Sequence, residues 1–210
     1  PKKIAFTEIK ESLDEISEIT LLFLSNIKII NVKISFDNKE SFTKISKSNY
    51  QKNLVKISYS NKINRDDNTY YLVFSKKSEK IPQNINLAFQ LKFDVKNKII
   101  NIEKKYSDQF TIVPASPGLV SVSFPLVKET SKLKFFINAP FITDRARSSL
   151  KNNKINDELF KELQTLFFET VEQLKVMNFL NREFYEILPI SRDELEGNYE
   201  ELRIFLIKIL

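Results

Sequence analysis

Two arginines, Arg145 and Arg147, are the residues of this chain whose type and spacing best suit a defined chemistry. They lie in a polar loop, residues 141–153, of a chain that uses arginine six times and lysine 27 times. The guanidinium group is planar and always charged, and it can bind phosphate through two parallel hydrogen bonds, which lysine cannot do. A second interpretation stays open, in which an arginine pairs with Asp144 at the surface for under about 1 kcal/mol.

The other candidate side chains lack the partners that catalysis needs. Ser148 and Ser149 have no histidine base anywhere in the chain, so we expect them to cap a helix or to form a turn. The pair Asp66 and Asp67 is typical of a turn. Four glutamates near the C-terminus are spaced as a solvated stripe of a helix: Glu158, Glu162, Glu169 and Glu172. We therefore predict neither a metal site nor a pair of catalytic carboxylates.

Three features of the composition exclude whole classes of enzyme. The 210 residues contain no histidine and no cysteine, which excludes imidazole bases, thiol nucleophiles, disulfides and thiolate zinc sites in this chain. They contain only two glycines, Gly118 and Gly197, too few for a glycine-rich phosphate loop. We therefore expect the isolated chain not to be an enzyme and to hold no cofactor of its own.

The charges are unevenly distributed along the chain. Residues 1–154 carry 27 basic and 15 acidic side chains, whereas residues 155–210 carry 6 and 12. We predict a basic, β-rich first region that packs with an acidic, helical second region in the same domain. A basic surface can bind nucleic acid. Such surfaces usually concentrate arginine and aromatic residues, however, so solvated lysines on strand faces are the interpretation that we favour.

The elements that must position the arginines follow from the periodicity of apolar residues. A helix is expected from Thr7 to Leu24, and the alternation that follows is typical of an antiparallel meander. The predicted strands are residues 28–35, 53–60, 69–75, 84–95, 98–104, 119–126 and 133–139, with a tight hairpin at 94–98. The last of these strands leads into the loop that holds Arg145 and Arg147, so the base of the loop is anchored.

Two helices are predicted after the strands. The first has Asn156 as its N-cap. Its apolar stripe consists of five side chains at helical spacing: Phe160, Leu163, Phe167, Val171 and Leu174. Ser191 and Glu194 are expected to form a capping box for the second helix, which Gly197 weakens by about 1 kcal/mol. The predicted fold class is α+β, with a mostly antiparallel sheet followed by two C-terminal helices. Because the chain stops at Leu210 within an apolar helical pattern, we expect a fragment of a longer protein.

Several short motifs occur in a distinctive order. They are FPL at residues 124–126, a loop with Thr130, LKFFINAPF at 133–141 and RARSSL at 145–150, and then Asn156 and the amphipathic residues 159–177. This order resembles a segment of sacsin-like proteins, in which a Leu-Pro-Leu strand, a Thr-Gly loop, a His-Val-Asn-Gly strand and an Arg-rich turn precede an Asn and a helix. These proteins belong to the GHKL ATPases, with the ninety-kilodalton heat-shock chaperones and the MutL proteins of mismatch repair. Residues 19–30, ITLLFLSNIKII, are similar to the segment before the first strand of that region. The glycine of the family's loop is absent here.

The resemblance implies a transducer, or middle, domain with a ribosomal-S-five-like sheet. In that superfamily ATP and Mg bind to a separate N-terminal domain, and the transducer contributes one basic side chain to the γ-phosphate. By position this side chain is Arg147, with Arg145 as the second choice. Such a cation stabilises the charge that develops on the phosphoryl oxygens only when the two domains close. The implied partner is therefore the N-terminal ATP-binding domain of the same parent protein.

Two other interpretations stay open. The chain can be a non-enzymatic binding module, whose basic sheet face within residues 28–104 contacts nucleic acid or an acidic protein. It can also form a homodimer through the exposed apolar stripe of its last helix. No apolar run approaches the roughly 20 residues that span a bilayer. Since cysteine is also absent, we expect a cytoplasmic protein without a membrane partner.

Overall fold

A computed structural model describes residues 18–36, 39–51, 53–61, 67–94, 99–116, 118–126, 128–129 and 131–210. The strands are β1 (Ile29–Phe36), β2 (Lys39–Asn49), β3 (Leu54–Asn61), β4 (Asp67–Lys77), β5 (Asn84–Phe93), β6 (Phe110–Ile112), β7 (Val120–Val122), β8 (Phe124–Pro125) and β9 (Phe136–Asn138). The helices are α2 (Lys154–Val176), α3 (Arg182–Glu186) and α4 (Gly197–Ile209). Short 3-10 turns form η1 (Glu18–Leu21), η2 (Tyr106–Asp108) and η3 (Ser191–Asp193).

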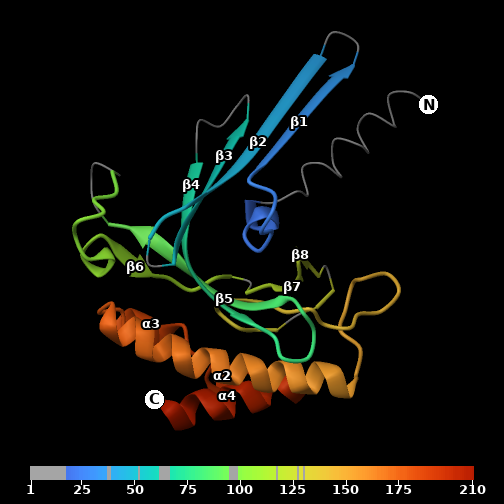
Figure 1. The fold of residues 1–210 in the computed structure, drawn as a ribbon, viewed down its shortest axis with the longest axis vertical. Coiled ribbons are helices and arrows are strands. Elements are labelled where there is room, and N and C mark those ends of the chain that lie inside the picture. The colour runs from blue at the N-terminus through green and yellow to red at the C-terminus, as the bar shows by residue number, and fades with distance from the viewer. Residues whose placement is uncertain are drawn as a thin grey trace.

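All of these strands belong to one sheet, in the order β1-β2-β3-β4-β5-β9-β7-β8, with β6 paired to β5 beside β9. Strands β1 to β5 form an antiparallel meander (Figure 1), and β7 pairs with β9 in parallel. The predicted α+β class, a mostly antiparallel sheet followed by C-terminal helices, is therefore confirmed. Within the described residues no helix is both long and apolar enough to cross a membrane.

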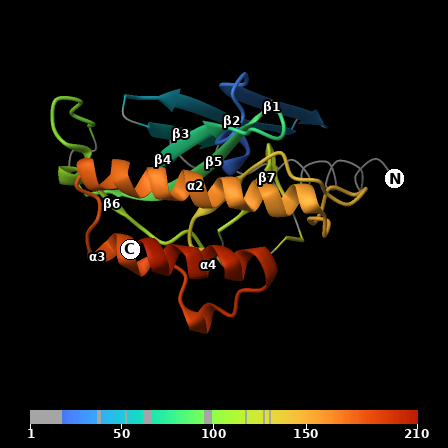
Figure 2. The same ribbon diagram turned by 60° about the horizontal axis from the view of Figure 1, so that its bottom comes forward.

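The two faces of the sheet are covered by different elements. Helix α2 packs against one face of the sheet, and α4 packs against α2 (Figure 2). The core there includes Phe89 of β5, Phe167 of α2 and Leu202 of α4. On the opposite face, Leu21 and Leu22 of the η1 segment pack against the strands. Strand β5 is consequently buried on both sides, which explains its run of five buried residues from Ile85 to Phe89.

Phenylalanine rings connect the sheet to the helices. The ring of Phe89 lies 5.6 Å from that of Phe135, 6.0 Å from that of Phe167 and 6.2 Å from that of Phe184. All four rings are fully buried. These rings come from four places: β5, α2, α3 and the residue just before β9. The sheet and the C-terminal helices therefore share one hydrophobic core. Edge-to-face packing of such rings adds to the free energy gained by burial.

Several of the expected strand positions were wrong. The expected strand at 98–104 is not formed by the described residues 99–104, where Ile99 and Ile102 are strongly exposed. The expected strand at 119–126 is divided into β7 and β8 by Ser123, which has a left-handed φ of 64°. Strands β2 and β6 were not predicted. Most of the expected helix at 7–24, and the hairpin at 94–98 apart from Asp94, lie outside the described residues.

The helix ends also differ from the expected ones. Asn153, not Asn156, is the N-cap of α2, and its side chain accepts a hydrogen bond from Ile155 N at 2.8 Å. The expected capping box of Ser191 and Glu194 is replaced by Asp193, which accepts from Ile190 N at 2.7 Å in η3. A short third helix, α3, precedes this turn. Gly197 is the first residue of α4, so it does not interrupt the helix interior.

Candidate functional site

The two arginines lie at the tip of a tight turn, which we call the Arg loop and define as residues 143–150. Thr143 and Leu150 form an antiparallel bridge at its base. Within it, Asp144 N donates to Ser149 O at 3.0 Å, and Arg147 N donates to Asp144 O at 3.1 Å. Four residues separate the loop from β9, and the loop precedes α2. Hydrogen bonds within the loop thus hold its backbone in a closed turn, and the loop lies between β9 and α2, both of which belong to the core.

The side chain of Asp144 organises the interior of the Arg loop. Its carboxylate accepts hydrogen bonds from Ser148 N at 2.8 Å, Ser148 Oγ at 2.7 Å and Ser149 Oγ at 3.2 Å. These bonds, above all that from the Ser148 hydroxyl, lower the pKa of Asp144 from 3.8 to about 2. Asp144 is therefore committed to the two serines. The described residues show no ion pair between it and either arginine, so the surface pairing that the sequence left open is not formed.

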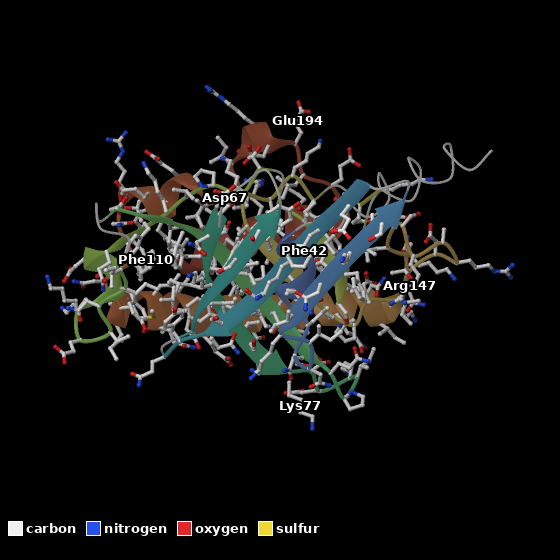
Figure 3. All side chains as sticks on the ribbon, turned by 90° about the horizontal axis from the view of Figure 1, so that it is seen from above. Phe42, Asp67, Lys77, Phe110, Arg147 and Glu194 are labelled. Atoms are coloured by element: carbon white, nitrogen blue, oxygen red, sulfur yellow. The ribbon has the colours of Figure 1, made fainter. Side chains whose placement is uncertain are left out.

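Arg145 and Arg147 are both exposed, and neither guanidinium has a hydrogen bond or an ion pair within the described part of the chain. Arg147 projects from one end of the molecule (Figure 3). Its φ of 54° is left-handed, a conformation that costs a non-glycine residue roughly 1 kcal/mol or more. The loop therefore presents two unpaired positive charges on a turn whose backbone is fixed.

A buried asparagine clamps the base of the Arg loop to the first turn of α2. Asn156 Oδ1 accepts from Ile142 N at 2.8 Å, and its Nδ2 donates to Ile142 O at 2.9 Å and to Lys151 O at 2.8 Å. The side chain is 1% exposed. Because it holds the residues on both sides of the loop, Asn156 fixes the direction in which the loop leaves the core.

Glu129 connects the Arg loop to a second helix. Its Oε2 accepts from Leu150 N at 2.8 Å, and its Oε1 accepts from Tyr199 OH of α4 at 2.6 Å. The neighbouring Lys128 N donates to Ser148 O at 3.0 Å. Burial, followed by the bond to Glu129, raises the pKa of Tyr199, so this hydroxyl stays a donor at any physiological pH. The Arg loop is thus held from α2 on one side and from α4 on the other.

The other residues singled out in the sequence form no site. Glu158 pairs with Lys80, in the connection between β4 and β5, at 3.2 Å, and Glu169 pairs with Lys76 of β4 at 2.6 Å. These two glutamates therefore face lysines and not one another. In the described ranges there is no group of three or more acidic side chains that could hold a metal ion. Asp67 begins β4, and Asp66 lies outside the described residues, as does Thr130.

Sequence reasoning missed the three side chains that hold the Arg loop in place. Asn156 was assigned to helix capping, and Asp144 was considered only as a partner for arginine. For Glu129 the sequence carries no signal, because its partners Leu150 and Tyr199 are 21 and 70 residues away. A second Asn three residues after Asn153, at the start of an expected helix, is the one sequence pattern that could have indicated a clamp.

Comparison with known proteins does not identify a family for this chain. No family model, no curated protein and no solved structure matches the chain. Its chemistry must therefore be inferred from the Arg loop itself, whose two guanidinium groups can bind an anion.

Proposed function

We propose that this chain is the transducer-like middle domain of a GHKL-type ATPase. In this proposal Arg147 donates its guanidinium to the γ-phosphate of ATP, which binds with Mg to a separate N-terminal domain of the same cytoplasmic protein. Domain closure brings the two together, so hydrolysis is coupled to conformation. The support comes from the order of the motifs and from one observation: an exposed, unpaired Arg147 on a turn that is held by Asp144, Asn156 and Glu129.

The geometry suits a cation that acts on a neighbouring domain. A side chain that must reach a phosphate across an interface has to be free of local partners, and its backbone has to be fixed so that little order is lost on closure. Arg147 meets both conditions, because Asp144 is occupied by Ser148 and Ser149. Arg145, two residues earlier, is exposed in the same turn and is the second candidate.

The test is the rate of ATP hydrolysis by the parent protein with Arg147→Ala. We expect kcat to fall about a thousandfold, as for other arginines that stabilise phosphoryl transfer, with little change in the KM for ATP. The matched control is Arg182→Ala, which removes an exposed arginine whose partner, Glu186, lies on the same short helix. Unchanged turnover in both the Arg145→Ala and the Arg147→Ala proteins would refute the mechanism.

A binding module is the second candidate, and one observation favours it. Strands β1 to β3 place Lys33, Lys44 and Lys56 on the same face of the sheet, where Phe42 is also exposed. Glu40 pairs with Lys33 at 3.0 Å and partly offsets this charge. Binding of the isolated chain to an oligonucleotide should then weaken steeply with salt and with Lys44→Ala. No binding at low ionic strength would remove this candidate.

A further inference from the structure

A polar groove lies beside η1, on the face of the sheet that η1 covers. Figure 1 shows that η1 and α2 lie on opposite sides of the sheet. Its volume is about 770 Å³, within the range of small-molecule sites. The polar side chains that matter here are those of Lys47, Ser75, Asn86, Ser123 and Asn138. Among the described residues that line the groove, none is acidic and one, Lys47, is basic.

Asn138 places an unpaired donor in this groove. The residue is 6% exposed, and its Oδ1 accepts a hydrogen bond from Ser123 N at 2.8 Å. A main-chain N–H can only donate, so this bond fixes which end of the carboxamide is the oxygen. The Nδ2 group then points elsewhere, and it has no hydrogen-bond partner in the described parts of the chain. This Nδ2 is not among the buried atoms that lack a partner in the described residues, so it is accessible from the groove and can donate to a ligand there.

A second carboxamide lies directly opposite the first. Asn86 of β5 is the register partner of Asn138 in β9, so their side chains share one face of the sheet. Asn86 is 7% exposed, and its Oδ1 accepts from Ser75 Oγ at 2.6 Å. Its Nδ2 reaches only Asn84 O, at 3.5 Å, the outer limit of a hydrogen bond. The floor of the groove thus offers the NH₂ groups of two neighbouring carboxamides. The oxygen of each carboxamide already accepts a hydrogen bond from the protein.

Lys47 gives the groove its charge. Its ammonium group donates to Leu22 O at 3.4 Å and, more closely, to Leu24 O, both uncharged main-chain groups. Burial, together with the nearby Lys28, lowers the pKa of Lys47, which is the effect expected of a cation without a counter-ion. No carboxylate within the described residues pairs with it. An anion in the groove would supply the missing opposite charge.

We propose that this groove binds a small organic carboxylate through the NH₂ groups of Asn86 and Asn138, with Lys47 providing the positive potential. A carboxylate offers two oxygens that only accept hydrogen bonds, which matches two neighbouring donors. A metal ion does not fit, because the free groups are donors. A neutral sugar would make no use of the uncompensated charge. This inference is independent of the proposed function, since no Arg loop residue lines the groove.

The test is an NMR titration of the 210-residue chain with acetate, succinate and citrate, with succinamide as the neutral counterpart of succinate. We expect at least one carboxylate to shift the side-chain NH₂ resonances of Asn86 and Asn138, and succinamide to leave them unchanged. Lack of a shift with all three carboxylates would overturn the proposal. Equal shifts with succinamide, or tighter binding of inorganic phosphate, would overturn the assignment to a carboxylate.

Asn138→Asp is the informative variant. It keeps an oxygen for Ser123 N but replaces the free NH₂ with a negatively charged acceptor, so the affinity should fall at least about tenfold. Asn152→Asp adds the same charge at an exposed position outside the groove and should bind as the unaltered protein does. If Asn138→Asp fails to fold, Asn86→Asp tests the same donor pair. Unchanged affinity in a folded Asp variant would refute the site.

Discussion

The hydroxyl of Tyr199 donates a hydrogen bond of 2.6 Å to Glu129, whose other carboxylate oxygen accepts from the main chain of Leu150 at 2.8 Å. The side chain of Glu129 thus links the first turn of α4 to the end of the Arg loop. The ring of Tyr199 also packs edge-on against Phe160 of α2, at 5.1 Å. A displacement of α4 would therefore move the acceptor that holds Leu150, and the position of this helix is coupled to that of Arg147.

Tyr199→Phe should loosen the Arg loop without unfolding the chain. The substitution leaves one oxygen of Glu129 without its donor, and we expect a loss of about 1 kcal/mol in the free energy of unfolding. Hydrogen exchange should show faster exchange of the Leu150 amide and, in the loop, of the Arg147 amide. Tyr185→Phe, at a half-exposed position on α3, is the control and should change neither quantity. Unaltered exchange at Leu150 in Tyr199→Phe would show that α4 does not hold the loop.

Asn156 should contribute more to stability than the N-cap Asn153, although both lie at the start of α2. Asn156→Ala removes the acceptor of Ile142 N and the donor to Lys151 O, whereas Ile142 O keeps its bond from Lys151 N, so we expect a loss of about 2 kcal/mol. Asn153→Ala removes one bond at an accessible helix end and should cost about 1 kcal/mol. Denaturant unfolding of the two variants measures the difference. Equal losses would contradict the clamp.

The parts of the fold that the sequence predicted are those in which apolar residues recur with a regular period. Residues 84–93 alternate between apolar and polar side chains and form β5, although the structure buries both faces of this strand. The stripe of Phe160 and Phe167 lies on the buried side of α2. Strand β2 was missed because Phe42 and Ile45 are its only apolar residues, and it is held mainly by pairing with β1 and β3. Main-chain pairing of this kind leaves no periodic signal.

For the candidate site, the sequence predicted the two arginines but not the hydrogen bonds that hold the Arg loop in place. Arg145 and Arg147 were identified from the rarity of arginine and from motif order, and their function remains a prediction. The clamps were not predicted, because each joins residues that only the folded chain brings together. Glu129 and Tyr199 are 70 residues apart, and Asn156 reaches back 14 residues to Ile142. Hydrogen bonds between residues so far apart in the sequence follow no spacing rule.

The folded chain should be more stable with glycine at position 147 than with alanine there. Both variants remove the guanidinium, but only glycine adopts the φ of 54° without a steric cost. We therefore expect Arg147→Gly to be about 1 kcal/mol more stable than Arg147→Ala. Arg145 has no left-handed φ, so there the order should reverse, with glycine less stable than alanine by about 0.5 kcal/mol. Thermal unfolding of the four variants tests whether the loop holds Arg147 in a strained conformation.

The hydrogen bonds of Asp144 predict an acid-labile Arg loop. Its pKa is about 2 in the folded chain against 3.8 for an unperturbed carboxyl, so the native state favours the ionised form. The stability that it contributes is complete above about pH 4 and is lost as the pH falls through the folded pKa near 2. The difference in the free energy of unfolding between the unaltered chain and Asp144→Asn should therefore shrink between pH 4 and pH 2. Ser148→Ala removes the strongest of these bonds and should move the loss to higher pH. Parallel stability curves for the unaltered chain and Asp144→Asn over this interval would show that the serines do not stabilise the ionised carboxylate.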